Sequence, residues 1–281
     1  KRRLASAKPW REWLAANQAR LDAVADPAGV GEVTASRAVE PAATLGGGNG
    51  QAAKVAVVNG GHHAVDPWRA AGVAGERSSL LELQRAFGYT LEDLKVILAP
   101  MATDGAEPIG SMGNDTPLAV LSDRPQLLAN YFKQLFAQVT NPPLDAIREE
   151  IITSMITTIG SEGNLLASTP EQARLLRLET PIITNAECAR IKSLRQPGLV
   201  AQTISLVFPA AEGAAGMRKR LDAIRAEAAQ ALEAGATILV LSDRGVDRER
   251  AAVPALLATA GVHHHLVRAG TRTRCGLVVE T

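Results

Sequence analysis

Cysteine is scarce in this 281-residue chain, which contains it only at Cys188 and Cys275. Two thiols are too few for a disulfide framework, so the composition favours a reducing compartment and we expect a cytoplasmic protein. Long apolar runs are also missing, since no stretch reaches the roughly 18 residues that a membrane-spanning helix needs. The basic first residues lead to Glu12 and not to a hydrophobic signal core. The sequence therefore predicts neither a membrane span nor a secretory signal.

The chain has no excess of charge of either sign, because 30 Lys and Arg residues stand against 29 Asp and Glu residues. A nearly neutral chain has no general electrostatic attraction for nucleic acid or for an anionic membrane surface. We therefore expect no nucleic-acid partner and no membrane partner. Apolar residues are plentiful at 46% of the sequence, which is ample for the core of one large domain or two modest ones.

Both ends of the sequence suggest a piece of a longer protein, since there is no initiator Met and the chain stops at Thr281 directly after an apolar run. Apolar residues at near-helical spacing predict a connector helix over residues 1–25. Residues 26–79 are rich in Ala, Gly and Val and are expected to form a linker or insertion. Their GGGNG stretch lacks the Lys-Ser or Lys-Thr of a phosphate-binding loop. The folded domain is expected over residues 80–281.

The middle of the chain carries several helix-start signals. A Thr or Asp that precedes an apolar helical face can accept hydrogen bonds from the first backbone amides of the helix. We expect the first helix to end at Pro100 and the second at Pro142, because proline blocks helix continuation. Glycine and polar residues predict an irregular loop over 104–115. The expected capping residues are Thr90, Asp123, Thr169 and Thr184.

The last part of the chain alternates apolar runs with amphipathic segments, which is typical of β-α-β units. We expect strands over 203–208, 236–242, 263–267 and 276–280, one helix from about Gly216, and a short helix from Pro254 that Gly261 stops. The expected fold class is α/β, with a helix-rich N-terminal half followed by parallel β-α-β units in a barrel-like or doubly wound arrangement.

The stretch from Gly88 to Asp145 contains three distinctive blocks in order, GYTLEDLKVILAPMA, GSMGNDTPLAVLSDRPQLL and YFKQLFAQVTNPPLD, and TPIIT and GTRTR follow later. Together they resemble the central domain of the glutamate synthase large subunit, from about Leu80 to Thr281. In that family the domain lies between a glutamine amidotransferase domain and an FMN-binding synthase domain, and it helps to wall the passage of ammonia. The resemblance implies a barrel-like domain without a cofactor of its own.

The intact enzyme implied by this resemblance converts L-glutamine, 2-oxoglutarate and a reductant into two molecules of L-glutamate. FMN and an iron–sulfur cluster are implied for that enzyme, with an NADPH-oxidising small subunit or ferredoxin as possible partners. The segment alone is expected to be inactive. Position 1 is Lys1 where the family's glutaminase has Cys, and two cysteines cannot supply the three neighbouring thiolates of the family's cluster.

Thr140 and Asn141 match the Thr-Asn pair that lines the entry to the ammonia tunnel in the family. A tunnel must keep ammonia away from bulk water while offering it hydrogen-bond partners. From the residues alone, the same pair can simply end a helix before Pro142 and Pro143. The resemblance favours the tunnel.

Three further groups of polar residues are candidate contacts for an anion or for a neighbouring domain. Asn114 and Asp115 lie in the predicted loop, where they can also bond to nearby backbone. Asp243 and Arg244 follow an expected strand, at the end where α/β proteins place their sites, although a role in capping the following helix is favoured. Arg272 belongs to a basic cluster with Arg268, Thr271 and Arg274, for which domain packing is favoured.

Histidines and cysteines give weaker indications. On a strand, His263 and His265 would share one face and could both approach a metal ion, but two ligands do not make a site. Cys188 is interpreted as a small core residue. Two other functions remain open, namely a stand-alone α/β module that binds an anionic or phosphorylated small molecule at residues 242–244 and 268–274, and a metal-dependent hydrolase that uses the histidines.

Overall fold

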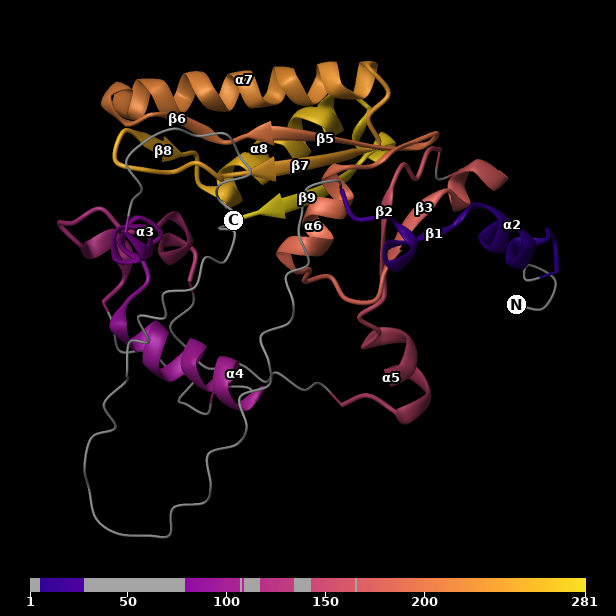
Figure 1. Cartoon of the computed structure of the whole chain (residues 1–281), viewed down its shortest axis with the longest axis horizontal. Coiled ribbons are helices and arrows are strands. Elements are labelled where there is room, and N and C mark those ends of the chain that lie inside the picture. The colour runs from indigo at the N-terminus through magenta and orange to yellow at the C-terminus, as the bar shows by residue number, and fades with distance from the viewer. Residues whose placement is uncertain (1–5, 28–78, 107, 109–116, 134–142, 165) are drawn as a thin grey trace, which may run out of the picture.

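The computed structural model describes residues 6–27, 79–106, 108, 117–133, 143–164 and 166–281 (Figure 1). Its largest sheet has the strand order β4-β5-β7-β9, with β4 antiparallel to β5 and the other three strands parallel. These strands are β4 (Arg195–Gln196), β5 (Leu199–Ser205), β7 (Ile238–Ser242) and β9 (Gly276–Glu280). The α/β class and the parallel β-α-β units are confirmed, and no sheet among the described strands closes into a barrel.

Helix α7 (Gly213–Glu233) lies in the chain between β5 and β7, and α8 (Ala255–Arg268) lies between β7 and β9. A two-stranded ribbon accompanies them, because β6 (Val207–Pro209) pairs antiparallel with β8 (Arg250–Ala252). Two short 3-10 turns, η7 (Ala210–Glu212) and η8 (Arg272–Arg274), precede α7 and β9. In Figure 1, α7 runs along one side of the sheet, beside β5.

The central strand β7 is buried on both faces, as a strand of a parallel sheet must be. Successive side chains of a strand point to opposite faces. Leu239 and Leu241 therefore join a core cluster with α7 and α8, whereas Ile238 and Val240 join a second cluster with Ile191 of α6 (Asn185–Lys192). Each fully buried aliphatic side chain of this kind stabilises the fold by about 1.5–3 kcal/mol.

A second sheet has the order β1-β3-β2, made from β1 (Ala19–Arg20), β2 (Thr157–Gly160) and β3 (Leu175–Leu178). The helix expected near the start is therefore shorter than predicted. It is α2 (Trp10–Asn17), and the chain then pairs with β3 and turns through η1 (Leu21–Ala23). Leu21 is buried in the second core cluster, so strand pairing and burial override the helical spacing of this segment.

The capping predictions at Thr169 and Thr184 are confirmed. The Thr184 hydroxyl accepts from the Glu187 amide while the Glu187 carboxylate accepts from the Thr184 amide, at the start of α6. The Thr169 amide donates to the Gln172 side chain at the start of a 3-10 turn, η6 (Pro170–Ala173). Helix α3 (Leu80–Ala86) begins with a further capping box at Ser79.

One predicted helix boundary in the middle of the chain is wrong. Thr90 caps its helix through Asp93 as expected, but the helix does not stop at Pro100. It passes through a wide π turn, η3 (Asp93–Leu98), and continues as α4 (Ala99–Asp104) until Gly105, which adopts a left-handed conformation. The π turn lies directly before Pro100, where the proline ring would clash with a carbonyl of a regular α-helix.

The helix predicted from Asp123 is not found in the described residues. That region contains only two 3-10 turns, η4 (Ala119–Leu121) and η5 (Leu128–Tyr131), and Ser122 rather than Asp123 accepts the Arg124 amide. Large apolar side chains here stay exposed, including Phe132 at 73%. Without a buried face, amphipathic spacing alone does not sustain a helix in water. A short helix, α5 (Ala146–Ile152), begins at Asp145, whose carboxylate accepts two backbone amides.

The strand predicted over 263–267 and the stop at Gly261 are also wrong, because α8 runs without a break through both. Gly261 faces α7, and a β-carbon at this position would lie 3.1 Å from Leu221 Cδ1. The glycine therefore permits a close approach of two helices and does not end one. Ala258, Val262 and Leu266, spaced four residues apart across Gly261, are all fully buried in the first core cluster.

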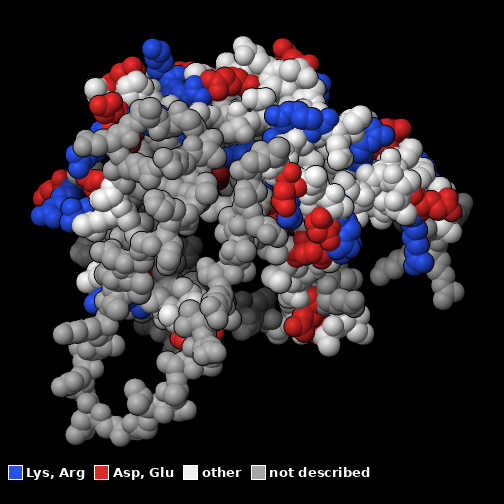
Figure 2. Space-filling view, in the orientation of Figure 1, with Lys and Arg blue, Asp and Glu red and all other residues white. Residues whose placement is uncertain are grey.

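No helix within the described residues is both long enough and apolar enough to cross a membrane. On the surface, Lys and Arg atoms alternate with Asp and Glu atoms along the upper rim of the molecule (Figure 2). This mixture agrees with the near-neutral charge of the sequence.

Candidate functional site

The carboxyl ends of β7 and β9 meet at one edge of the large sheet, because the two strands are parallel and in register from Ile238 and Gly276 to Ser242 and Glu280. This is the edge at which α/β proteins commonly bind ligands. Ser242 and Asp243 are buried here, at 4% and 6% exposure. The structure thus brings a polar cluster to the edge where the sequence predicted Asp243 and Arg244.

Glu280 is the centre of this cluster, and its side chain is only 12% exposed. Its carboxylate accepts from Lys192 Nζ at 2.6 Å and from Ser242 Oγ at 2.5 Å, and it lies 3.3 Å from Arg244 Nε. Burial raises the pKa of Glu280, but the hydrogen bonds from Lys192 and Ser242 outweigh it, so the pKa lies below its ordinary value. The ion pair ties α6 to the ends of β7 and β9.

Asp243 lies beside this network with a different environment. Its carboxylate accepts from the Thr281 hydroxyl at 2.5 Å, and its amide donates to the Glu280 carbonyl at 3.1 Å. Burial is the main influence and raises the pKa of Asp243 above its ordinary value. The favoured role for Asp243, capping a following helix, is wrong, because the chain turns into β8 after it.

The surroundings of Arg244 do not suit a phosphate group. Its guanidinium donates to Asn185 Oδ1 at 2.8 Å and lies beside the Glu280 carboxylate, and the Asp243 carboxyl is close by in sequence. An anion at this edge would meet two acidic groups and a cation that is already paired. The cluster therefore resembles a structural clamp more than a ligand site.

Arg272 lies at the opposite edge of the same sheet, because η8 precedes the amino end of β9. Its Nε donates to His263 Nδ1 at 3.1 Å and its Nη1 to the Cys275 carbonyl at 2.6 Å. Arg268 and Arg274 are exposed. A single anion site built from residues 242–244 and 268–274 is therefore not assembled, since the two segments lie at opposite ends of parallel strands.

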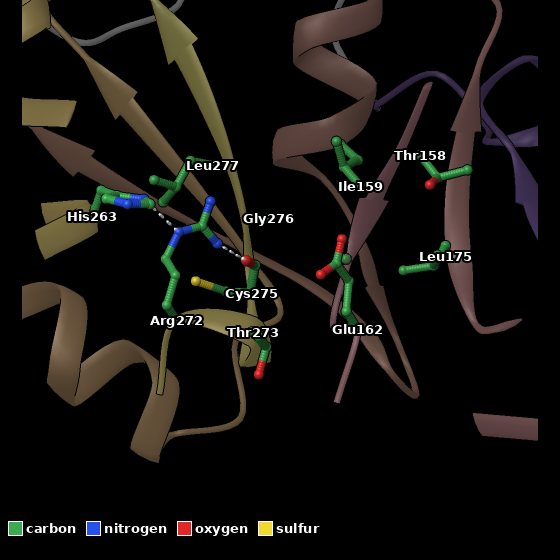
Figure 3. Close-up of a pocket in the computed structure, with 11 residues that line it drawn as sticks. Thr158, Ile159, Glu162, Leu175, His263, Arg272, Thr273, Cys275, Gly276 and Leu277 are labelled. Carbon is green, nitrogen blue, oxygen red and sulfur yellow. Dashed lines mark hydrogen bonds between the residues drawn. The ribbon is translucent and has the colours of Figure 1, made fainter. Parts of the chain in front are cut away.

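Arg272 and His263 line a cavity of about 300 Å³ between the two sheets (Figure 3). The residues that line it come from β2, β3, α8, η8 and β9, from the segment that follows β2, and from the residue before β9. They are Thr158, Ile159, Gly160, Glu162, Leu175, His263, Arg272, Thr273, Cys275, Gly276 and Leu277.

His263 and His265 lie on α8, so the alternation expected of a strand does not apply to them. His263 accepts a hydrogen bond from Arg272, and its ring packs edge-to-face against His264 with centroids 5.0 Å apart. Among the described residues, no group of three or more His, Cys, Asp or Glu side chains could hold a metal ion.

Both cysteines are free and buried, at 6% exposure for Cys188 and 2% for Cys275. Burial raises the pKa of each thiol. Cys188 belongs to the second core cluster, as its interpretation as a core residue predicted. Two thiols in the whole chain do not fit a cluster that needs three neighbouring thiolates.

Four candidate residues, Asn114, Asp115, Thr140 and Asn141, lie outside the described residues. Two partners in the site, Lys192 and Glu280, were missed by the sequence reasoning. Glu280 had a usable signal, because it ends an apolar strand parallel to the one that ends at Ser242. Lys192 had none, since its contact with Glu280 joins residues 88 positions apart.

A family model for the glutamate synthase central domain matches residues 82–281. The chain belongs to the glutamate synthase central domain family. It is 44% identical over 204 residues to the glutamate synthase [NADPH] large chain of Bacillus subtilis (strain 168). The aligned segment covers 73% of this chain and 13% of that protein. The central domain therefore spans only a small part of the length of this relative.

Relatives named for other reductants are similarly close. The glutamate synthase [NADH] of Schizosaccharomyces pombe is 46% identical over 198 residues, covering 70% of this chain and 9% of that protein. The chloroplastic ferredoxin-dependent glutamate synthase of Spinacia oleracea is 41% identical over 209 residues, covering 73% and 13% respectively. Similarity in the central domain thus does not distinguish between NADPH, NADH and ferredoxin.

Proposed function

We propose that this chain serves as the central domain of a glutamate synthase, joining a glutaminase domain to an FMN-binding synthase domain. The observation that carries the proposal is the family match over residues 82–281, together with 44% identity to a glutamate synthase large chain. The parent reaction would turn L-glutamine, 2-oxoglutarate and a reductant into two molecules of L-glutamate. The partners of this domain would be the other domains of the same polypeptide and either a small NADPH-oxidising subunit or ferredoxin. The enzyme would act in the cytoplasm.

In this proposal the domain at residues 80–281 performs no chemistry itself. FMN and the iron–sulfur cluster would belong to other parts of the parent enzyme. Thr140 and Asn141 would line the entry of the ammonia tunnel, where ammonia must cross without escaping to water.

The first test is an assay of the full-length protein for glutamate formation from glutamine and 2-oxoglutarate, with NADPH, NADH or reduced ferredoxin. The second compares Thr140→Leu with wild type in the same full-length protein. If Thr140 lines the tunnel, the larger apolar side chain will lower the glutamate formed per glutamine hydrolysed and release ammonia into the medium.

The matched control is Thr103→Leu, an equal change at an exposed residue of α4. It should leave the ratio of glutamate to hydrolysed glutamine unchanged. A Thr140→Leu enzyme that keeps the wild-type ratio would refute the tunnel role. A full-length protein that makes no glutamate with any of the three reductants would refute the proposed activity.

A further inference from the structure

The cavity between the two sheets holds two opposite charges that do not pair with each other. Figure 3 shows the guanidinium of Arg272 on one side of it and the carboxylate of Glu162 on the other. Within the described residues, no ion pair of 4 Å or less joins them. A ligand that carries both a negative and a positive group would satisfy each side.

The guanidinium of Arg272 is held in position with donors to spare. Its bonds to His263 Nδ1 at 3.1 Å and to the Cys275 carbonyl at 2.6 Å use Nε and Nη1. Nη2 has no hydrogen-bond partner in the described part of the chain. His263 Nδ1 accepts from Arg272 and so helps to fix the orientation of the guanidinium. Held in this way, Arg272 presents Nη2 as a fixed, charged donor for a carboxylate.

Glu162 is fixed through its main chain, and its side chain remains available. Its amide donates to the Thr273 carbonyl at 2.8 Å, and its own carbonyl accepts from Gln172 Nε2 at 3.1 Å. These bonds hold Glu162 next to η8, the turn that carries Arg272. Its carboxylate has no hydrogen bond or ion pair in the described residues, so it can accept a cationic group.

We propose that this cavity binds a free α-amino acid. The ligand carboxylate would accept a hydrogen bond from Arg272 Nη2, and the ligand ammonium group would donate to the Glu162 carboxylate. The side chain would lie against Ile159, Leu175 and Leu277, which line the same cavity. A volume of about 300 Å³ suits a ligand of that size. A plain anion would gain no contact with Glu162, which is exposed, and a plain amine would gain none with Arg272. The proposal does not rest on the proposed function, because the cavity lies within the described domain.

The test is calorimetric titration of the 281-residue chain with L-leucine and two analogues that each lack one charged group. 4-Methylpentanoate keeps the carboxylate without the ammonium group, and 3-methylbutylamine keeps the amine without the carboxylate. For so small a ligand we expect a dissociation constant on the order of 1 mM for leucine. Each analogue should bind at least about tenfold more weakly, since it loses one of the two charge-assisted contacts.

Variants locate the binding to the cavity. Arg272→Gln and Glu162→Gln should each weaken leucine binding about tenfold, whereas Arg274→Gln, on the same turn but outside the cavity lining, should not. If Arg272→Gln does not fold, the proposal is tested by leucine binding to Glu162→Gln and by titration of the wild-type chain with the two analogues. Equal binding of leucine and either analogue, no binding of leucine at tens of millimolar, or full binding by Glu162→Gln would each overturn the proposal.

Discussion

Replacing Glu280 by glutamine tests whether the buried ion network holds the sheet edge together. The change keeps the shape of the side chain and one acceptor oxygen but removes the charge that Lys192 and Arg244 share. Hydrogen bonds to charged groups contribute about 1.5–3 kcal/mol each. Both cations keep about a third of their surface in water, at 30% and 28% exposure, so they can be partly resolvated. We therefore expect a loss of about 2 kcal/mol in the free energy of unfolding at pH 7, below the 3–5 kcal/mol of a fully buried pair.

The pH dependence of this loss has a definite sign. The pKa of Glu280 is lower in the folded chain than its ordinary value, so its stabilisation is fully present above the unfolded pKa, near 4.3. It disappears as the pH falls through the lower, folded pKa. Glutamine does not titrate, so the difference in stability between wild type and Glu280→Gln should shrink steadily below about pH 4.

Urea unfolding followed by far-ultraviolet circular dichroism measures this difference as a shift in midpoint at constant slope. Glu233→Gln, at the exposed end of α7, is the matched control and should change stability by less than about 0.5 kcal/mol. Asp243→Asn provides a contrast, because burial raises the pKa of Asp243 and its charge is costly to bury. It should be much milder than Glu280→Gln at pH 7. A Glu280→Gln midpoint equal to wild type, or a difference that stays constant down to pH 3, would refute the reasoning.

Two other predictions concern the core. Replacing Gly261 by alanine should change the free energy of unfolding by less than about 1 kcal/mol, because the better helix propensity of alanine offsets the 3.1 Å approach of its β-carbon to Leu221. Replacing it by leucine should cost about 1–3 kcal/mol, because the larger side chain does not fit between the helices. Thermal unfolding of both variants checks this, and equal melting temperatures for the two would contradict it. The buried thiols of Cys188 and Cys275, with raised pKa values, should react with a thiol reagent at pH 8 only after denaturation; rapid labelling of the native chain would show that they are accessible.

Strands β7 and β9 and helix α7 follow from local sequence, because each of these strands is a short apolar run and α7 has an apolar stripe. The strand expected over 203–208 is divided between β5 and β6, and β8 was not predicted. The error at Gly261 has a physical cause: glycine weakens an isolated helix, but here it allows α7 and α8 to approach closely. The spacing of Ala258, Val262 and Leu266 carried the correct signal across it. Pro100 misled because the π turn before it accommodates the proline ring and lets the helix continue. Asp123 misled because the apolar side chains that follow it stay exposed.

Of the candidate site, only the residues at the ends of strands could be predicted from the sequence. Ser242 and Glu280 end two apolar runs, and parallel strands place such residues side by side. The contact of Lys192 with Glu280 depends on how α6 packs under the sheet. Arg272 and Glu162 come together because the Glu162 amide bonds to the Thr273 carbonyl, a contact between segments more than 100 residues apart. No local spacing encodes that contact.

The two edges of the sheet have different chemical capacities. At the carboxyl edge, where ligands of α/β proteins usually bind, Glu280 is paired with Lys192 and Arg244 and lies beside a buried acid. A ligand there would have to break existing charge-assisted bonds before it gained new ones. At the amino edge, Arg272 and Glu162 face a cavity with bonding capacity unused in the described residues. Binding there would cost no existing ion pair, which is why we assign recognition of a small molecule to the amino edge and mechanical support to the carboxyl edge.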